Sequence, residues 1–291
     1  MTGKLIKGVG GLYIVDAEQG TFECSVRGIF RKRNIVPTVG DFVDIQVIDE
    51  KEFKGNIVEI KKRKNSFVRP RVVNVDQTII VISAINPSIN YDLLDRTIVL
   101  AEEQGTEIAI CINKIDLGNR SEAEAIQEIY TKIGYNVVFT SNTQDQGIEE
   151  LEQVLFGKTS VFSGLSGVGK SSLTNKVLSE NRMATGYLSE KMGKGKHTTR
   201  HSELIKINEN SFIVDSPGFS SLSLSHIKPR ELSNLFREFR AFAGGCRFND
   251  CMHLDEPGCE VKSQQGRAIN DNRYNRYINF MAEINSSKNS Y

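Results

Sequence analysis

The chain has 291 residues, which is long enough for about two domains of ordinary size. Its 37 lysines and arginines nearly balance 36 aspartates and glutamates, so the net charge gives no argument for a nucleic-acid partner. The N-terminus lacks the apolar segment of a signal peptide, and the longest apolar run, residues 78–85, is too short to cross a bilayer. Because five cysteines are also too few for a disulfide framework, we expect a cytoplasmic protein without a membrane partner.

Residues 1–66 are predicted to form a small all-β domain. Short segments of alternating apolar and polar residues are separated by glycines and a proline at turn-like intervals. These segments are residues 11–17, 21–30, 41–49 and 54–60. The pattern predicts a five-stranded OB-like barrel, a fold that commonly binds oligonucleotides. Basic runs at 27–33 and 61–71 favour RNA contact, and ordinary solvated surface charge is the alternative for either run.

Residues 67–222 show the alternation of strands and helices typical of an α/β nucleotide-binding domain. Apolar, strand-like runs alternate with amphipathic segments such as 121–133. This pattern predicts a largely parallel sheet that is covered on both faces. The predicted strands are residues 77–84, 107–113, 135–140, 159–164 and 211–216.

The segment GLSGVGKS, residues 164–171, matches the phosphate-loop pattern G-x-x-x-x-G-K-[ST] in full. Its glycines allow backbone N–H groups to cradle phosphates at a helix N-terminus. Lys170 is expected to reach the β- and γ-phosphates, Ser171 to ligate Mg²⁺, and Ser172 to add a phosphate-side contact. The nucleotide-binding residues predicted here are Gly164, Leu165, Ser166, Gly167, Val168, Gly169, Lys170, Ser171 and Ser172. The pattern predicts a nucleoside triphosphate without indicating its base.

An N-K-x-D motif at the end of a predicted buried strand indicates the base. It consists of Asn113, Lys114, Ile115 and Asp116. Asp116 can accept hydrogen bonds from the ring N–H and the exocyclic amine of guanine, a pair of donors that adenine lacks. Asn113 suits the other edge of the base and a tether to the phosphate loop, and the stem of Lys114 can cover the ring, although four residues alone could equally form a surface turn. Ser141 is a further candidate, in a segment where Asn142 replaces the alanine usual in guanine-binding proteins.

The D-x-x-G segment DSPG follows the last predicted strand. Asp215 is expected to hold the coordination shell of Mg²⁺, and the backbone N–H of Gly218 to meet the γ-phosphate. The basic stretch 193–201 precedes it, and there Thr198 or Thr199 can offer a hydroxyl to Mg²⁺ when the γ-phosphate is bound. A disordered basic loop is also compatible with that stretch.

The base-reading motif therefore precedes the phosphate loop and both switch segments, which is a circularly permuted order. In these motifs and their order, over nearly its whole length, the chain resembles the ribosome small-subunit-dependent GTPase A family (RsgA). The resemblance implies a GTP hydrolase of late small-subunit (30S) maturation that binds the subunit and its rRNA and is stimulated by it. We hypothesise that the GTP state is coupled through the second switch to the C-terminal module. A monomer is expected.

Phe219 occupies the position after D-x-x-G where small signalling GTPases place a glutamine that orients water. A phenyl ring cannot orient water, so slow intrinsic turnover is predicted. His197, next to the switch threonines, is the best local replacement, with an ordinary surface histidine as the alternative. The catalytic candidates are His197, Thr198 and Thr199.

Residues 223–291 are mostly helical and then rich in cysteine, which predicts a zinc-binding module. The predicted ligands are Cys246, Cys251, His253 and Cys259. Three thiolates and one imidazole make a complete tetrahedral Zn²⁺ set with no open position, hence a structural site. Unrelated buried or free thiols are the alternative. Pro257 and Gly258 predict a turn before the last ligand, while Cys24 and Cys111 lie in apolar strands and are expected in the core.

Two further expectations concern the surface of this module. Residues 229–243 are predicted to form one helix with an apolar face. That face consists of Leu232, Leu235, Phe236 and Phe239. Basic and aromatic residues predict either an RNA-facing surface or an ordinary helix exterior. They are Arg247, Lys262, Arg267, Arg273, Tyr274, Arg276 and Tyr277.

Two other functions stay open on the sequence alone. The first is a self-sufficient phosphate-loop enzyme, such as an ATPase or a small-molecule kinase, which the N-K-x-D and D-x-x-G motifs disfavour. The second is a nucleic-acid-binding scaffold in which GTP is only a structural ligand, which Phe219 keeps possible.

Overall fold

The computed structural model describes residues 1–26, 30, 36–118, 120–185, 202–215 and 222–288, with only the backbone described for 180–185, 215 and 288. Contacts divide the chain into two compact units. The first unit comprises Met1–Ile79, Gly147–Ser163 and Gly169–Ser220. The second unit comprises Ile80–Gln146, Gly164–Val168 and Ser221–Tyr291.

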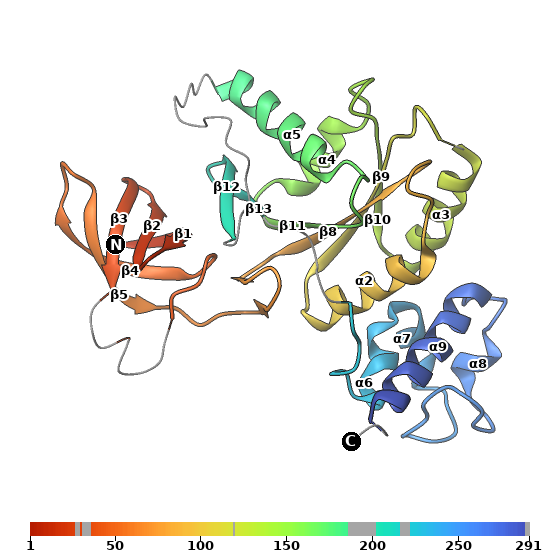
Figure 1. Cartoon of the computed structure of the whole chain (residues 1–291). Helices are drawn as coiled ribbons and strands as arrows, with labels where there is room; N and C mark the ends of the chain where they lie inside the picture. Colours follow the sequence, from red (N-terminus) through yellow and green to blue (C-terminus); the bar gives the residue numbers. More distant parts are fainter. Residues whose placement is uncertain (27–29, 31–35, 119, 186–201, 216–221, 289–291) are drawn as a thin grey trace. The chain divides into compact units, whose positions relative to one another are not determined.

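A closed five-stranded barrel forms the N-terminal part of the first unit (Figure 1). Its strands are β1 (Thr2–Val9), β2 (Leu12–Ala17), β3 (Gly20–Val26), β4 (Phe42–Asp49) and β5 (Lys54–Ile60). They close in the order β1-β2-β3-β5-β4, in which only β3 and β5 pair in parallel. The predicted barrel is confirmed. The sequence missed β1, because Lys4 points inward there and a bulge between Leu5 and Lys7 interrupts the alternation of apolar and polar residues.

The barrel core continues into the strands that follow it in the first unit. Those strands are β11 (Thr159–Ser163), β12 (Glu203–Asn208) and β13 (Ser211–Asp215). Phe22 and Ile57 from the barrel belong to the same buried cluster as Leu204, Phe212 and Val214. Since apolar burial is the main stabilising term in folding, the barrel and these strands stabilise one another.

One six-stranded sheet has the order β10-β9-β8-β11-β13-β12. Its other strands are β8 (Gln77–Ser83), β9 (Glu107–Asn113) and β10 (Asn136–Thr140), and β6 (Ser66–Phe67) with β7 (Val72–Val73) forms a separate pair. β9 and β10 are parallel, as are β11 and β13, whereas β12 runs antiparallel to β13. All five predicted strands are confirmed. The edge strand β12 was not predicted, because only one of its six residues is buried.

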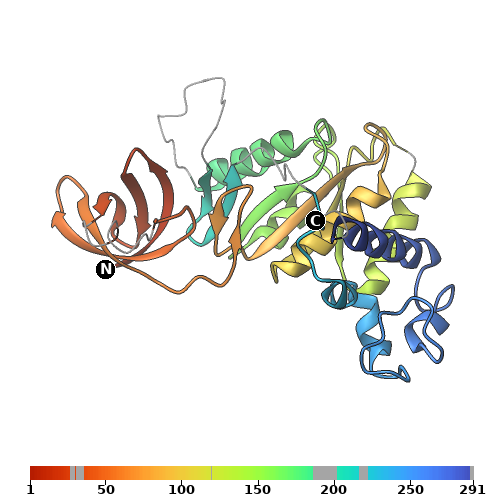
Figure 2. The ribbon, with the colours of Figure 1, turned by 60° about the horizontal axis from the view of Figure 1, so that its bottom comes forward.

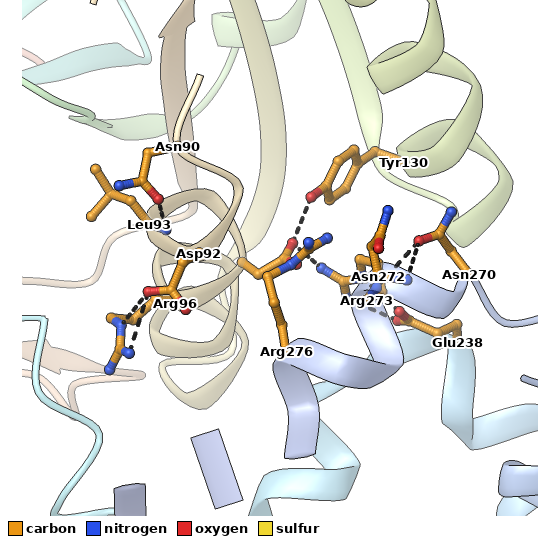
Figure 3. A network of polar contacts seen from close by, with 11 residues as sticks. Asn90, Asp92, Leu93, Arg96, Tyr130, Glu238, Asn270, Asn272, Arg273 and Arg276 are labelled. Carbon is orange, nitrogen blue, oxygen red and sulfur yellow. Dashed lines mark hydrogen bonds and ion pairs between the residues drawn. The ribbon is translucent and has the colours of Figure 1, made fainter. Parts of the chain in front are cut away.

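Helices accompany these strands within each unit. In the second unit α2 (Tyr91–Glu103) contacts β9 and α3 (Arg120–Ile133) contacts β10. In the first unit α4 (Ile148–Leu155) contacts α5 (Lys170–Thr185), which also contacts β12. Asn90 begins α2, because its side chain accepts a 3.0 Å hydrogen bond from the backbone N–H of Leu93 (Figure 3).

The C-terminal residues of the second unit form several short helices and one long one. These are α6 (Pro229–Leu232), η1 (Ser233–Leu235), η2 (Arg237–Phe239), α7 (Arg240–Ala243), α8 (Glu260–Ser263) and α9 (Asp271–Lys288). The prediction of one continuous helix over 229–243 is wrong, because Phe236 has extended backbone angles, φ −98° and ψ 99°. Leu232, Phe236 and Phe239 are nevertheless buried together as predicted, and Leu235 is partly buried against them. The long helix α9 packs on α2 and α6 (Figures 1 and 2).

A buried polar network joins α9 to α2 and α3. The Arg273 side chain is fully buried, forms an ion pair with Asp95, and donates to Glu238 at 2.6 and 3.0 Å. Arg276 pairs with the other oxygen of Asp95, and the Tyr130 hydroxyl donates to Asp95 at 2.6 Å. Figure 3 shows Tyr130, Arg273 and Arg276 converging from α3 and α9. Two carboxylates thus balance two guanidinium groups inside the second unit.

This arrangement corrects the expectation for the C-terminal surface. Arg273, Tyr274 and Tyr277 are each no more than 3% exposed, so they form neither an RNA-facing surface nor a helix exterior. Tyr274 and Tyr277 use their hydroxyls to donate to backbone oxygens of the loop that precedes α8. The sequence pattern could not predict this burial. Arginine is normally a surface residue, and the carboxylate partners that allow it to be buried are distant in the sequence.

The buried network generates a stability prediction. Arg273→Met should lower the free energy of unfolding by about 3–5 kcal/mol, because it leaves buried carboxylates without their main cation. Urea unfolding measures the change. Arg120→Met is the matched control: Arg120 pairs with Glu124 on an exposed surface, and its loss should cost less than about 1 kcal/mol. Equal effects of the two substitutions would contradict the assigned role of the network.

Lys4 generates a pH prediction within the first unit. Its ammonium lies 4.8 Å from the ring centre of Phe42 and 4.9 Å from that of Phe212, and it donates to the Thr159 hydroxyl. Burial lowers the pKa of Lys4 from 10.5 to about 8. Between pH 8 and pH 10.5 the unfolded chain holds a proton on Lys4 that the folded chain has lost. The free energy of unfolding should therefore increase with pH across this range, by about 3 kcal/mol in total.

The Lys4 prediction is checked by urea unfolding at a series of pH values from 7 upward. Lys4→Met should remove the increase above pH 8, whereas Lys51→Met, a change at an exposed position, should retain it. An increase that persists unchanged in Lys4→Met would show that other groups cause it.

Candidate functional site

The phosphate-loop segment turns sharply after β11. Gly164 has φ 142°, and a Cβ atom there would lie 2.1 Å from the carbonyl oxygen of Val81, so no larger residue fits. Gly167 and Gly169 also have positive φ, at 84° and 100°. Val168 is buried, while Leu165, Ser166 and Gly167 are exposed. The glycines therefore let the backbone of this loop pass close to Val81 and leave residues 165–167 exposed, as the pattern predicts.

Asn113 ties the end of β9 to this loop. Its side chain is 2% exposed, and its amide nitrogen donates to the carbonyl oxygen of Val168 at 2.9 Å. Its amide oxygen accepts from the Thr140 hydroxyl at 3.1 Å, which fixes the orientation of the amide. The expected tether between the N-K-x-D motif and the phosphate loop is present.

Lys114 forms a second link between the same segments. Its ammonium group donates to the carbonyl oxygens of Gly167 and Asn86, each at 2.7 Å. Asn86 lies in the loop that follows β8, and no sequence motif indicated its part in this contact. Lys114 itself has φ 63°, and Ile115 is partly buried against the core of the second unit. Three separate loops therefore meet around one lysine.

The carboxylate of Asp116 is held by hydroxyl groups. The Thr143 hydroxyl donates to it at 2.7 Å, and the Ser141 and Thr143 hydroxyls lie 3.1 Å apart. Hydrogen bonds from Ser141 and Thr143 lower the pKa of Asp116. Ser141 was a predicted site residue, whereas Thr143 was not predicted, although it directly follows Asn142 in the same segment. The carboxylate is therefore ionised and oriented at neutral pH.

The first unit contains the helix that follows the phosphate loop. α5 begins at Lys170, and the backbone N–H of Leu173 donates to Gly169 at 2.9 Å. Burial lowers the pKa of Lys170, while Ser171 and Ser172 are exposed in the first turn. The first turn of a helix offers free backbone N–H groups and a positive partial charge, both of which favour phosphate.

The second-switch residue Asp215 ends β13, and its side chain is outside the described part. The remaining switch predictions also lie outside the described residues. They are His197, Thr198, Thr199, Gly218 and Phe219.

Four potential metal ligands meet in the C-terminal part of the second unit. The donor atoms of Cys246, Cys251, His253 and Cys259 all lie within 4.8 Å of one another. The Nδ1 atom of His253 is 3.5 Å from the sulfurs of Cys246 and Cys259, which are 4.0 Å apart. A tetrahedral ion with bonds of about 2.3 Å to sulfur and about 2.0 Å to nitrogen sets neighbours roughly 3.5–3.8 Å apart. The donor set can hold a metal ion.

The surroundings of this cluster fix its loops. Glu256 accepts 2.8 Å hydrogen bonds from the backbone N–H groups of Met252 and Leu254, which flank His253. The Cys259 sulfur accepts from the N–H of Lys262 at 3.3 Å and begins α8. The predicted turn at 257–258 is confirmed. The role of Glu256 was not predicted, because an acidic residue between metal ligands forms no recognisable sequence motif.

Burial shapes the protonation of the cluster. It raises the pKa of the Cys251 thiol to about 12 and lowers the pKa of His253. A buried neutral thiol is a poor ligand until a cation displaces its proton, whereas a neutral imidazole is ready to bind. By contrast, Cys24 and Cys111 are buried in strands, as predicted for core residues.

The basic run 61–71 is partly neutralised inside the first unit. Lys61, Arg63 and Lys64 form ion pairs with Asp44, Asp41 and Asp76. The exposed members for which the described part of the chain records no ion pair are Lys62, Arg69 and Arg71. Most of the other basic run, 27–33, lies outside the described residues.

Comparison with known proteins agrees with this geometry. The sequence model of the RsgA GTPase family matches residues 60–225, and that of the RsgA N-terminal domain matches residues 2–57. The chain belongs to the RsgA family. The relative named "Small ribosomal subunit biogenesis GTPase RsgA" from Alkaliphilus metalliredigens is 46% identical over 98% of both chains. Its namesake from Caldanaerobacter subterraneus is 47% identical over 97% of this chain and 95% of its own.

Solved structures agree with the RsgA assignment. One, described as the crystal structure of YloQ, a circularly permuted GTPase, is 38% identical with a TM-score of 0.85, covering 98% of this chain and 95% of its own. YjeQ from Thermotoga maritima is 35% identical with a TM-score of 0.85, covering 97% and 98%. This RsgA-family chain is therefore a GTP hydrolase with a circularly permuted GTPase domain. Among its described helices, none combines the length and apolar character needed to cross a bilayer.

Proposed function

We propose that this protein hydrolyses GTP during late maturation of the small (30S) ribosomal subunit, to which it binds as a cytoplasmic monomer, with its turnover stimulated by that subunit. The observation that carries the proposal is the pair of contacts from Asn113 and Lys114 to the phosphate loop. These contacts bring a guanine-reading motif against a phosphate-binding loop. The relatives of this chain are named as GTPases of small ribosomal subunit biogenesis.

In this proposal the triphosphate lies on the phosphate loop, with Lys170 neutralising charge on the β- and γ-phosphates. Mg²⁺, bound with GTP, takes ligands from Ser171 and from Thr198 or Thr199, with Asp215 in its shell. The Gly218 N–H meets the γ-phosphate. Ser172 adds a phosphate-side contact. The exposure of Ser171 and Ser172 in the first turn of α5 supports these roles.

Asp116 is proposed to read guanine by accepting from both donors on its edge. Lys114 covers the ring with its stem, since its ammonium group is held by two carbonyl oxygens on either side. Ser141 lies in the segment 140–142, which is proposed to offer a backbone N–H to the base carbonyl. Adenine would leave the acceptor oxygens of Asp116 without both of their donors, so ATP is rejected.

RNA contact is proposed for the barrel and the segment that leaves it. Lys62, Arg69 and Arg71 are the exposed members of the basic run without recorded internal partners in the described part, so their charge is available to phosphates. Lys61, Arg63 and Lys64 serve the fold instead.

The coupling of the second switch to the C-terminal module stays a proposal with one supporting observation. Leu224 and Ile227, which closely follow the D-x-x-G segment, are buried in the core of that module. A shift at the switch would therefore pull directly on packed residues. His197 is proposed as the group that replaces the missing glutamine beside Phe219.

A single structural Zn²⁺ is proposed at the Cys246, Cys251, His253 and Cys259 cluster. The donor distances match a tetrahedral ion, and the four donors leave no position for substrate. When bound, the ion supplies the charge that keeps buried thiolates deprotonated and ties together the loops around α8.

The function is tested by phosphate release from GTP and ATP, with and without purified small subunits. We expect slow release from GTP alone, at least tenfold faster release with the subunit, and no stimulated release from ATP. Lys170→Ala should abolish stimulated turnover, while Lys132→Ala, a change on the exposed surface of α3, should not. Equal use of ATP would indicate a general phosphate-loop enzyme, and binding without stimulated turnover would indicate a scaffold.

Metal removal tests the zinc site. Metal analysis of the purified protein should find one Zn²⁺ per chain, and Cys251→Ser should lower this content. Chelation should lower the unfolding temperature by roughly 10 °C, because the ligand loops lose their cross-link. Cys111→Ala is the matched control, since that thiol lies in β9, outside the cluster, and its loss should leave the zinc content unchanged. Zinc-free native protein would refute the assignment.

A further inference from the structure

We propose that Thr143 is a positioning residue that sets the guanine specificity of this protein by orienting the carboxylate of Asp116. The inference deepens the proposed function and rests on the assignment of Asp116 as the base reader. Thr143 does not itself need to touch the nucleotide, since it acts through the hydrogen bond that it donates to Asp116 at 2.7 Å.

The bonding around Thr143 allows one arrangement of its proton. An ionised carboxylate only accepts hydrogen bonds, so the single hydroxyl proton of Thr143 points to Asp116. The Ser141 hydroxyl oxygen accepts from the backbone N–H of Gln144 at 3.2 Å and lies 3.1 Å from the Thr143 hydroxyl. Its own proton is therefore directed toward Thr143 or Asp116. The two hydroxyls form a directed chain that ends on the carboxylate.

The backbone fixes the place of Thr143. Ser141 and Gln146 exchange two backbone hydrogen bonds, of 3.0 and 3.1 Å, which close a tight turn over residues 141–146. Asp145 has φ 53°, so the turn has a defined left-handed residue. Thr143 lies inside this closed turn, and its position does not depend on side-chain packing, because the residue is exposed.

Orientation matters because guanine presents two donors in one plane. Among the described residues no cation pairs with Asp116, so without the hydroxyls its carboxylate group could rotate about its last bond. Thr143 occupies one acceptor direction of Oδ2. The Ser141 hydroxyl also bonds the carboxylate, and the remaining acceptor directions of Oδ1 and Oδ2 stay available for the base. The carboxylate is thereby held ready for two parallel bonds, which single-donor bases cannot use.

The test compares GDP with inosine diphosphate, which lacks the exocyclic amine and offers only the ring N–H. Binding to the full-length protein is measured by calorimetry for wild type, Thr143→Val and Thr143→Ser. We expect Thr143→Val to bind GDP about tenfold more weakly, as for loss of one hydrogen bond to a charged group. Its affinity for inosine diphosphate should change less than about twofold, because one bond tolerates rotation. Thr143→Ser should restore the wild-type ratio.

The controls separate the two levels of the proposal. Thr131→Val removes a hydroxyl at an exposed position of α3 and should change neither affinity. Unchanged GDP binding in Thr143→Val, or equal weakening of both nucleotides, would overturn the role of Thr143 alone. Wild-type protein that binds GDP no more tightly than ADP would overturn base reading by Asp116 and the role of Thr143 together.

Discussion

One buried amide holds the nucleotide-reading part of this molecule together. In a permuted chain the base-reading strand and the phosphate loop are separated by a helix, two strands and a further helix, so sequence proximity does nothing to align them. The Asn113 amide, 2% exposed, supplies the alignment by donating to Val168 while Thr140 holds its other end. An amide with both ends committed has one orientation, which makes it a rigid spacer between the two loops. The contacts of Lys114 are built on this fixed strand end, and the turn that carries Thr143 follows the neighbouring strand β10, whose Thr140 bonds Asn113.

The C-terminal module is attached to the same unit by charge as well as by apolar packing. Separating Arg273 from Asp95 and Glu238 would leave several buried charges without partners, at a cost comparable to a large part of a domain's stability. The module therefore keeps its place on α2 and α3 in any conformation of low energy. In the proposed coupling, a shift of the second switch must move these helices with the module, or must act on the loops that lead into it.

Local sequence patterns predicted much of this structure. The features that they did not predict depend on contacts between particular side chains. The phosphate loop, the N-K-x-D motif and the metal ligands depend on short spacings, so they are legible in the sequence. The roles of Lys4, Arg273 and Thr143 could not be predicted from such spacings. Each depends on a hydrogen bond or ion pair to a residue that is distant in the sequence. A buried lysine concealed β1, a buried arginine was considered for an RNA-facing surface, and the exposed Thr143 was not among the predicted site residues. The break in the helix at Phe236 could not be predicted either, because the apolar residues around it have the spacing of a continuous helix.

The shared core of the barrel and the later strands has a consequence for the order of synthesis. The residues of this cluster up to Val75 leave the ribosome long before Leu204, Phe212 and Val214, which complete it. At ordinary rates of translation the interval is on the order of ten seconds. During that time the nascent barrel exposes apolar surface that β12 and β13 cover in the folded chain. A chain truncated before β12 would lack Leu204, Phe212 and Val214 and would keep that side exposed.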